Sequence, residues 1–204
     1  MRVLAGSARG VPLKTVPDMD TRPILDRVKK SLFSILDAAG LLAGARVLDL
    51  YAGTGVQGIE ALSRGAAFCY FVERRNEAVA LLRENLAKTR LDALAEARLG
   101  DVRLTLDQLL ARVQREGERF APFDLILYDP PFAFSRADAT RGAVSEEMAL
   151  AGKLLSGEHA RLVLRTEKKV DPPQPVGLTL ARHWTDGPHA LCFYAAAMAA
   201  ADKC

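Results

Sequence analysis

A carboxylate followed by two prolines and an aromatic residue is the feature of this sequence best suited to chemistry. The segment Asp129-Pro130-Pro131-Phe132 follows the hydrophobic run 125–128. The Asp129 carboxylate and the Pro130 carbonyl could accept the two N–H bonds of an exocyclic amine and so localise its lone pair toward a methyl donor. The prolines hold the carbonyls in an extended path, and Phe132 offers a flat face for stacking a base. We predict that these four residues bind and activate an amine.

A glycine-rich turn predicts a cofactor site. A hydrophobic strand containing Asp49 runs into the pattern Gly-x-Gly-x-x-Gly at residues 53–58. Glycine permits positive φ and lets a ligand approach bare backbone, and the helix that follows points free N–H groups at the ligand. Nicotinamide enzymes use this pattern too, so by itself it is a weak signal. The turn residues expected to bind the cofactor are Ala52, Gly53, Thr54, Gly55 and Gly58.

Carboxylates at the ends of the predicted strands distinguish a nicotinamide dinucleotide from S-adenosylmethionine as the cofactor. Asp49 would repel a pyrophosphate but attract the sulfonium and α-ammonium groups of S-adenosylmethionine. Glu73, about 20 residues after the first glycine, can accept both ribose hydroxyls. Asp101 can accept from the adenine amino group, and it can also cap the helix that begins after it. We therefore predict S-adenosylmethionine as the cofactor, with Asp129 beside it.

Alternating strands and helices are expected to position these residues. We predict strands at 46–51, 67–73, 95–99, 123–129, 159–165, 176–182 and 191–197. We predict helices at 56–64, 76–89, 102–114 and 144–155. Such alternation indicates a Rossmann-like α/β fold of the class I methyltransferase type. It has a mostly parallel seven-stranded sheet, helices on both faces and an antiparallel C-terminal strand.

The N-terminal residues 1–43 are predicted to form a small β-hairpin and helix appendage on a methyltransferase domain spanning 44–204. The hairpin would pair strands at 2–5 and 11–16, and Val28, Leu32 and Leu36 recur at helical spacing after it. Basic residues outnumber acidic ones before residue 31. That excess favours contact with RNA phosphates, although an ordinary solvated face would have a similar composition. The expected RNA contacts are Arg9, Lys14, Arg22, Arg27 and, in the loop after Phe132, Arg136 and Arg141.

Composition narrows the class of protein. The chain has 204 residues, is 50% hydrophobic and carries a net charge of +3, which suits a single α/β unit with its own core. Cys69, Cys192 and Cys204 form no CxxC pair, and the three histidines lack ligand spacing, so we expect no metal site. The sequence has no apolar run of about 20 residues and no secretory signal. We therefore expect a cytoplasmic protein that does not bind a membrane, and we expect it to be a monomer.

With both motifs in place, the chain resembles the class I amino-methyltransferases. It more closely resembles RsmD, the family of small-subunit (16S) ribosomal RNA guanine-N2 methyltransferases. The resemblance covers nearly the whole chain and is closest over 49–65, with further matching segments at 5–10, 21–23, 26–28 and 129–132. It implies methylation of guanine N2 in ribosomal RNA or in a small ribosomal subunit particle. The spacing of the motifs alone indicates only that the methyl acceptor is an amine.

The motifs by themselves are compatible with other functions. The Asp-Pro-Pro-aromatic segment also suits an amino-methyltransferase acting on adenine N6 of nucleic acid or on a protein glutamine amide. The basic first 30 residues and the lack of a separate DNA-recognition domain favour RNA. A nicotinamide-dependent oxidoreductase is opposed by Asp49 and by the Asp129 segment. A binding module without activity is opposed by the intact motifs.

Overall fold

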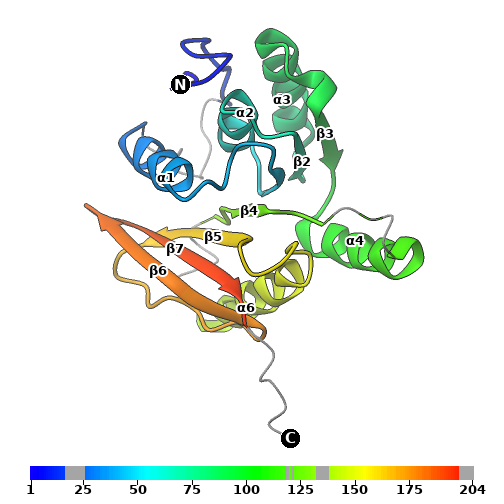
Figure 1. The fold of residues 1–204 in the computed structure, drawn as a ribbon, viewed down its shortest axis with the longest axis vertical. Helices are drawn as coiled ribbons and strands as arrows, with labels where there is room; N and C mark the ends of the chain where they lie inside the picture. Colours follow the sequence, from blue (N-terminus) through cyan, green and yellow to red (C-terminus); the bar gives the residue numbers. More distant parts are fainter. Residues whose placement is uncertain (17–25, 118–119, 121, 132–137, 198–204) are drawn as a thin grey trace, which may run out of the picture.

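A seven-stranded sheet forms the centre of the molecule. The computed structural model describes residues 1–16, 26–117, 120, 122–131 and 138–197, with the side chains of 138–141 excepted. The strands lie in the order β3-β2-β1-β4-β5-β7-β6 (Figure 1). They are β1 (Arg46–Leu50), β2 (Phe68–Glu73), β3 (Ala95–Leu99), β4 (Leu125–Tyr128), β5 (Arg161–Glu167), β6 (Leu178–Asp186) and β7 (His189–Ala196).

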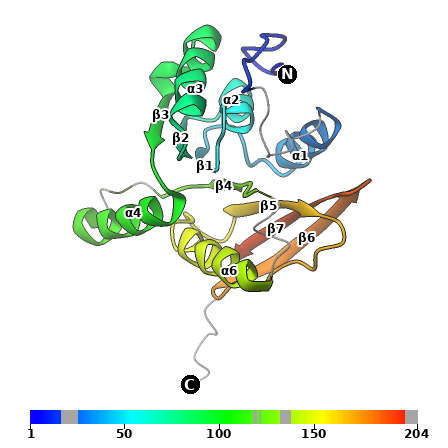
Figure 2. The same ribbon diagram turned by 180° about the vertical axis from the view of Figure 1, so that it is seen from behind.

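Helices cover both faces of the sheet. They are α1 (Asp26–Ala38), α2 (Val56–Ser63), α3 (Asn76–Thr89), α4 (Val102–Glu116) and α6 (Asp138–Gly152), with a short 3-10 turn η1 (Asp92–Leu94). Figures 1 and 2 show α1, α2 and α3 on one side and α4 and α6 on the other. Each side has its own buried apolar cluster, because successive side chains of a strand point to opposite faces. Within the described residues, no helix is long and apolar enough to cross a membrane.

The sheet confirms the predicted fold class. Strands β1 to β5 pair in parallel, and β7 runs antiparallel between β5 and β6. The ranges predicted for β3 and α3 match the observed ones, whereas α6 begins at Asp138, six residues before the predicted start at 144. The apolar pattern of α6 starts only with the buried Val144, so periodicity detected only the later part of the helix.

The N-terminal residues form a shorter hairpin than predicted. Between the segments 2–5 and 11–16, Arg2 bridges Pro12 in antiparallel fashion, and the Val3 N–H donates to the Val11 carbonyl at 3.0 Å. Side chains of the sheet domain also hold this segment. The buried Glu60 of α2 accepts hydrogen bonds from the backbone N–H groups of Leu4, at 2.7 Å, and Ala5, at 3.1 Å.

Buried contacts join residues 1–16 and α1 to the rest of the core. Val3, Leu13 and Phe33 belong to the same apolar cluster as strands β1 and β2. The buried Lys29 of α1 donates to the Arg2 carbonyl at 2.7 Å and lies 3.5 Å from Glu60. Burial lowers the pKa of Lys29, and the neighbouring Glu60 carboxylate opposes that shift. The division at residue 43 stays a prediction, and across it the two parts share one core.

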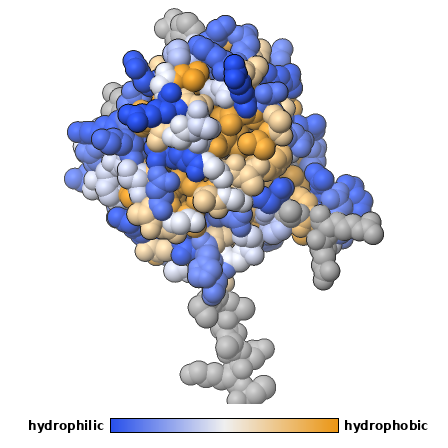
Figure 3. Space-filling view, turned by 45° about the horizontal axis from the view of Figure 1, so that its top comes forward, coloured by the Kyte–Doolittle hydropathy of each residue, from blue (hydrophilic) through white to orange (hydrophobic). Residues whose placement is uncertain are grey.

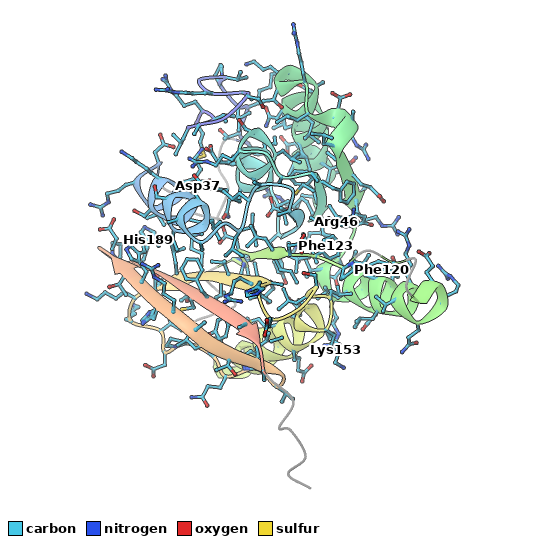
Figure 4. All side chains as sticks on the ribbon, in the orientation of Figure 1. Asp37, Arg46, Phe120, Phe123, Lys153 and His189 are labelled. Atoms are coloured by element: carbon cyan, nitrogen blue, oxygen red, sulfur yellow. The ribbon has the colours of Figure 1, made fainter. Side chains whose placement is uncertain are left out.

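The amino ends of β1 and β4 form the sheet edge opposite the predicted site. Figure 4 labels Arg46 and Phe123 there. The Arg46 guanidinium lies 4.7 Å from the centre of the Phe68 ring and 5.9 Å from that of Phe123. Asp124 accepts a hydrogen bond from the Arg46 backbone N–H at 2.9 Å. These contacts stabilise the sheet, and the predicted site lies at the opposite ends of the strands.

Candidate active site at the carboxyl ends of the strands

The predicted site residues meet at one edge of the sheet. In the parallel register, Leu50 of β1 lies opposite Val72 of β2 and Tyr128 of β4. The glycine-rich turn, Glu73 and Asp129 follow those three positions directly, so the sheet brings them together. Open α/β folds bind their ligands at this edge.

The turn after β1 leaves open space above its first glycine. Gly53 has φ +55°, and a Cβ added there would meet nothing within 4 Å. Tyr51 also adopts positive φ, at 61°, which is rare for a residue with a side chain. At Gly58, by contrast, an added Cβ would lie 2.3 Å from the Phe71 ring. Gly53 therefore gives a ligand access to backbone, while Gly58 lets α2 pack closely on the sheet.

Glu73 reaches from the end of β2 into this turn. Its Oε2 accepts the Gly53 N–H at 2.9 Å, and its Oε1 accepts the Arg75 N–H at 2.9 Å. The side chain is buried. A carboxylate offers about four acceptor positions, so two remain for further donors. This arrangement suits the predicted contact with ribose hydroxyls, which stays a prediction.

Asp49 lies beneath the turn. Its Oδ2 accepts the Gly58 N–H at 2.9 Å, and the residue is 1% exposed. Burial raises the pKa of Asp49 to about 8; the Gly58 hydrogen bond opposes the shift, and the negative charges of Asp129 and Glu73 add to it. A neighbouring cation would favour the ionised form. The predicted attraction of Asp49 for a cationic ligand is consistent with this position and stays a prediction.

The other predicted cofactor residues are placed by backbone contacts. The Ala52 N–H donates to the Val72 carbonyl at 3.0 Å, and the Thr54 carbonyl accepts from Asn85 at 3.0 Å. Asp101 caps α4, since its Oδ1 accepts the Leu104 N–H at 3.1 Å. Its exposed side chain leaves the predicted contact with adenine open.

Asp129 is held by donors from two other elements. Its Oδ2 accepts from Nε2 of Gln57 in α2 at 2.7 Å. Its Oδ1 pairs with Nε of Arg165 in β5 at 2.8 Å. The side chains of Asp129 and Arg165 are 12% and 8% exposed. The carboxylate at the start of the Asp-Pro-Pro segment is thus fixed next to the glycine-rich turn.

Comparisons with known proteins decide the family. The family model described as Conserved hypothetical protein 95 matches residues 1–195. The chain belongs to this family of RsmD-like methyltransferases. YlbH of Bacillus subtilis (strain 168) is 34% identical over 195 residues, which cover 95% of this chain and 98% of YlbH. Ribosomal RNA small subunit methyltransferase D of Escherichia coli (strain K12) is 29% identical over 155 residues, covering 76% of this chain and 72% of that protein.

Solved structures agree with the fold of this RsmD-like methyltransferase. The Thermus thermophilus protein TTHA0928 has a TM-score of 0.75 and 31% identity, covering 95% of this chain and 98% of that one. The Escherichia coli protein yhhF has a TM-score of 0.71 and 28% identity, covering 96% and 97%. The predicted class I methyltransferase fold and the predicted family are both confirmed.

Two tyrosines of the RsmD-like methyltransferase are tied together by a residue that sequence reasoning missed. Glu147 of α6 accepts hydrogen bonds from the hydroxyls of Tyr51 and Tyr128, each at 2.8 Å. The two rings meet edge to face with centroids 5.7 Å apart. Burial, and then the Glu147 charge, raise the pKa of both hydroxyls well above its usual range. Tyr51 precedes the glycine-rich turn and Tyr128 precedes Asp129, so Glu147 connects both motifs to α6.

Gln57 and Arg165 were also missed by sequence reasoning. Gln57 lies inside the glycine-rich pattern at a position that the pattern leaves unspecified. Arg165 is the last residue of the predicted strand 159–165, whereas β5 continues to Glu167 and Arg165 is buried within it. Its partner Asp129 lies 36 residues earlier in the chain, and only the pairing of β4 with β5 brings the two together.

The predicted RNA contacts are only partly within the described residues. Arg9, Lys14 and Arg27 are exposed. Lys14 pairs with Glu84 at 2.5 Å and Arg27 with Asp186 at 2.7 Å. Figure 3 shows one face of the molecule on which hydrophilic surface surrounds a hydrophobic patch. The predicted contacts outside the described residues or side chains are Phe132, Arg22, Arg136 and Arg141.

The remaining members of the catalytic segment are two prolines. Pro130 is buried and Pro131 is half-buried, directly after the β4 strand. Among the described residues, no group of histidine, cysteine or carboxylate side chains could hold a metal ion. The predicted role of Asp129 and the Pro130 carbonyl as acceptors for an amine stays a prediction.

Proposed function

We propose that this RsmD-like methyltransferase transfers a methyl group from S-adenosylmethionine to the exocyclic N2 amine of a guanine in small-subunit ribosomal RNA. The observation that carries the proposal is the Asp129 carboxylate, fixed at the end of β4 beside the open turn at Gly53. Membership in a family whose relatives include ribosomal RNA small subunit methyltransferase D supports ribosomal RNA as the substrate.

The residues present fit S-adenosylmethionine. Gly53 leaves space for a ligand against bare backbone, and Glu73 has acceptor positions left for ribose hydroxyls. Asp49 and Glu73 make the surroundings of the turn acidic, which suits a ligand that carries a sulfonium and an α-ammonium group. When bound, the cofactor supplies an electrophilic methyl group and leaves as the neutral thioether.

Asp129 and Pro130 would act on the amine. The Asp129 carboxylate and the Pro130 carbonyl would each accept a hydrogen bond from one N–H of the amine, which localises the nitrogen lone pair toward the methyl carbon. As the nitrogen forms the new bond it becomes more acidic, so an acceptor on its N–H is worth more in the transition state than in the ground state. The nitrogen then loses one proton, which the Asp129 carboxylate receives and passes to water.

To test the proposal, RNA and small ribosomal subunits are each incubated with the protein and radiolabelled S-adenosylmethionine, and the labelled nucleoside is then identified. We expect N2-methylguanosine. Asp129→Ala should lower turnover by about a hundredfold or more, the scale for losing a positioned hydrogen-bonding group. Asp129→Asn should keep partial activity, because its amide oxygen still accepts one hydrogen bond. Asp107→Asn, at an exposed position of α4, is the matched control.

Each alternative product has a clear meaning. Label in N6-methyladenosine would assign the enzyme to adenine, and label in methylglutamine of a ribosomal protein would assign it to the amide. Turnover at the wild-type rate in Asp129→Ala would show that the amine mechanism is wrong and that Asp129 is a structural turn residue.

A further inference from the structure

The Asp129 carboxylate is restrained on both of its oxygens. Gln57 donates to Oδ2 at 2.7 Å, and Arg165 donates to Oδ1 at 2.8 Å. The two donors come from different elements, since Gln57 lies in the first turn of α2 and Arg165 lies near the end of β5. Both residues are themselves buried.

We propose that Arg165 and Gln57 are positioning residues that fix the Asp129 carboxylate in the orientation needed to accept an N–H bond of the target amine. This inference rests on the proposed function. A carboxylate has about four acceptor positions in its plane. Because one position on each oxygen is occupied by a fixed donor, the plane of the carboxylate and its two remaining acceptor positions are fixed as well.

The arrangement suits orientation better than it suits stability alone. A buried ion pair adds little net stability compared with apolar side chains of similar volume, because both charges must leave water. Arg165 stands in the buried part of β5, between the buried Leu164 and Thr166. Its guanidinium reaches the one carboxylate that begins the Asp-Pro-Pro segment. Misplacing a reacting group by about 1 Å can cost about a hundredfold in rate.

Two variants remove one donor each. Arg165→Met keeps much of the side-chain volume but removes the guanidinium, and Gln57→Met removes the amide while leaving the ion pair in place. We expect each to lower kcat by about tenfold to a hundredfold, with the affinities for S-adenosylhomocysteine and for RNA unchanged. Arg165→Lys should recover part of the rate. Arg161→Met, on the same strand but bonded to the carbonyls of Glu158 and Ala160, is the matched control.

A double-mutant cycle separates positioning from a general structural role. If Arg165 acts only through Asp129, combining Arg165→Met with Asp129→Ala should lower kcat no further than Asp129→Ala alone. The same should hold for Gln57→Met. A structural role would instead give multiplied losses, together with weaker cofactor binding and a lower Tm.

The outcomes distinguish this inference from the proposed function. Wild-type kcat in both Arg165→Met and Gln57→Met, with Asp129→Ala inactive, would overturn the positioning role and leave the amine mechanism standing. Multiplied losses in the double mutants would overturn it too. Wild-type turnover in Asp129→Ala would remove the proposed function itself. If Arg165→Met does not fold, Gln57→Met decides the question by the same cycle.

Discussion

Binding of the proposed cofactor should release a proton from Asp49. Burial raises the pKa of this carboxyl to about 8 from an ordinary value of 3.8. At pH 7 the side chain is then about nine-tenths protonated in the free enzyme. A ligand that carries a sulfonium and an α-ammonium group favours the ionised form, so binding and ionisation are linked. Asp49→Asn removes the titrating group while keeping an oxygen that can accept the Gly58 N–H.

The size of the effect follows from the pKa and from Coulomb's law. A unit charge about 6 Å away, at an effective dielectric constant of about 20, contributes roughly 3 kcal/mol. That energy corresponds to a pKa lowered by about 2, to roughly 6 in the complex. At pH 7 about 0.8 proton should leave per ligand bound, and the affinity should fall about fivefold between pH 7 and pH 6.

Titration calorimetry in two buffers of different ionisation enthalpy measures the released proton directly. Between pH 5.5 and 7 the α-ammonium group of the ligand remains protonated, since such groups titrate near pH 8. S-adenosylhomocysteine, which lacks the sulfonium charge, should release fewer protons than S-adenosylmethionine. Asp49→Asn should bind without proton release and with an affinity independent of pH, and Asp107→Asn, on the exposed surface of α4, should behave as the wild type. Equal proton release in wild type and Asp49→Asn would refute the reasoning.

Further variants test other parts of the site and its surroundings. Asp49→Asn should stabilise the ligand-free protein increasingly as pH rises from about 4 to 8 in thermal melts, because the folded state with its raised pKa binds more protons than the unfolded state; a constant difference would contradict this. Glu73→Ala should weaken cofactor binding by about 1–3 kcal/mol in calorimetry, and unchanged affinity would remove its ribose role. Gly58→Ala should lower stability by about 1–3 kcal/mol in denaturant titrations, since its Cβ would meet Phe71; an unaltered midpoint would contradict this close packing. Arg9→Ala and Lys14→Ala should each weaken RNA binding and reduce its salt slope by about 1 while leaving cofactor affinity intact; unchanged RNA affinity in both would move the RNA surface elsewhere.

Much of the fold could be predicted because the apolar patterns of its elements are regular. The range predicted for α3 matches the structure, since Val79, Leu82 and Leu86 recur on its buried face. The N-terminal hairpin was predicted from its local pattern and is present in a shorter form. The chain there also bonds to Glu60 and other groups distant in sequence, which a local pattern does not reveal.

The motifs predicted that the candidate residues share one end of the sheet, but not which side chains hold them there. Asp49, Gly53 and Glu73 could be placed because strand ends and glycine patterns have regular positions in α/β folds. Glu147, by contrast, bonds to a tyrosine 96 residues earlier in the chain, and Gln57 bonds to an aspartate 72 residues later. Such partners depend on how helices pack across the sheet, and a single sequence carries no periodic signal for that packing.

The start of α2 connects the two halves of the site. Gln57 donates through its side chain to Asp129, and the next residue, Gly58, donates through its backbone to Asp49. The two carboxyls lie at the ends of adjacent strands, with Leu50 opposite Tyr128 in the register. The first turn of α2 therefore positions both the Asp49 carboxyl and the Asp129 carboxylate that is proposed to face the amine. Because α2 packs on the sheet without room for a side chain at Gly58, it cannot shift toward the sheet without collision. The distance between the proposed methyl donor and its acceptor is thus held by rigid secondary structure, which is the condition for catalysis by positioning.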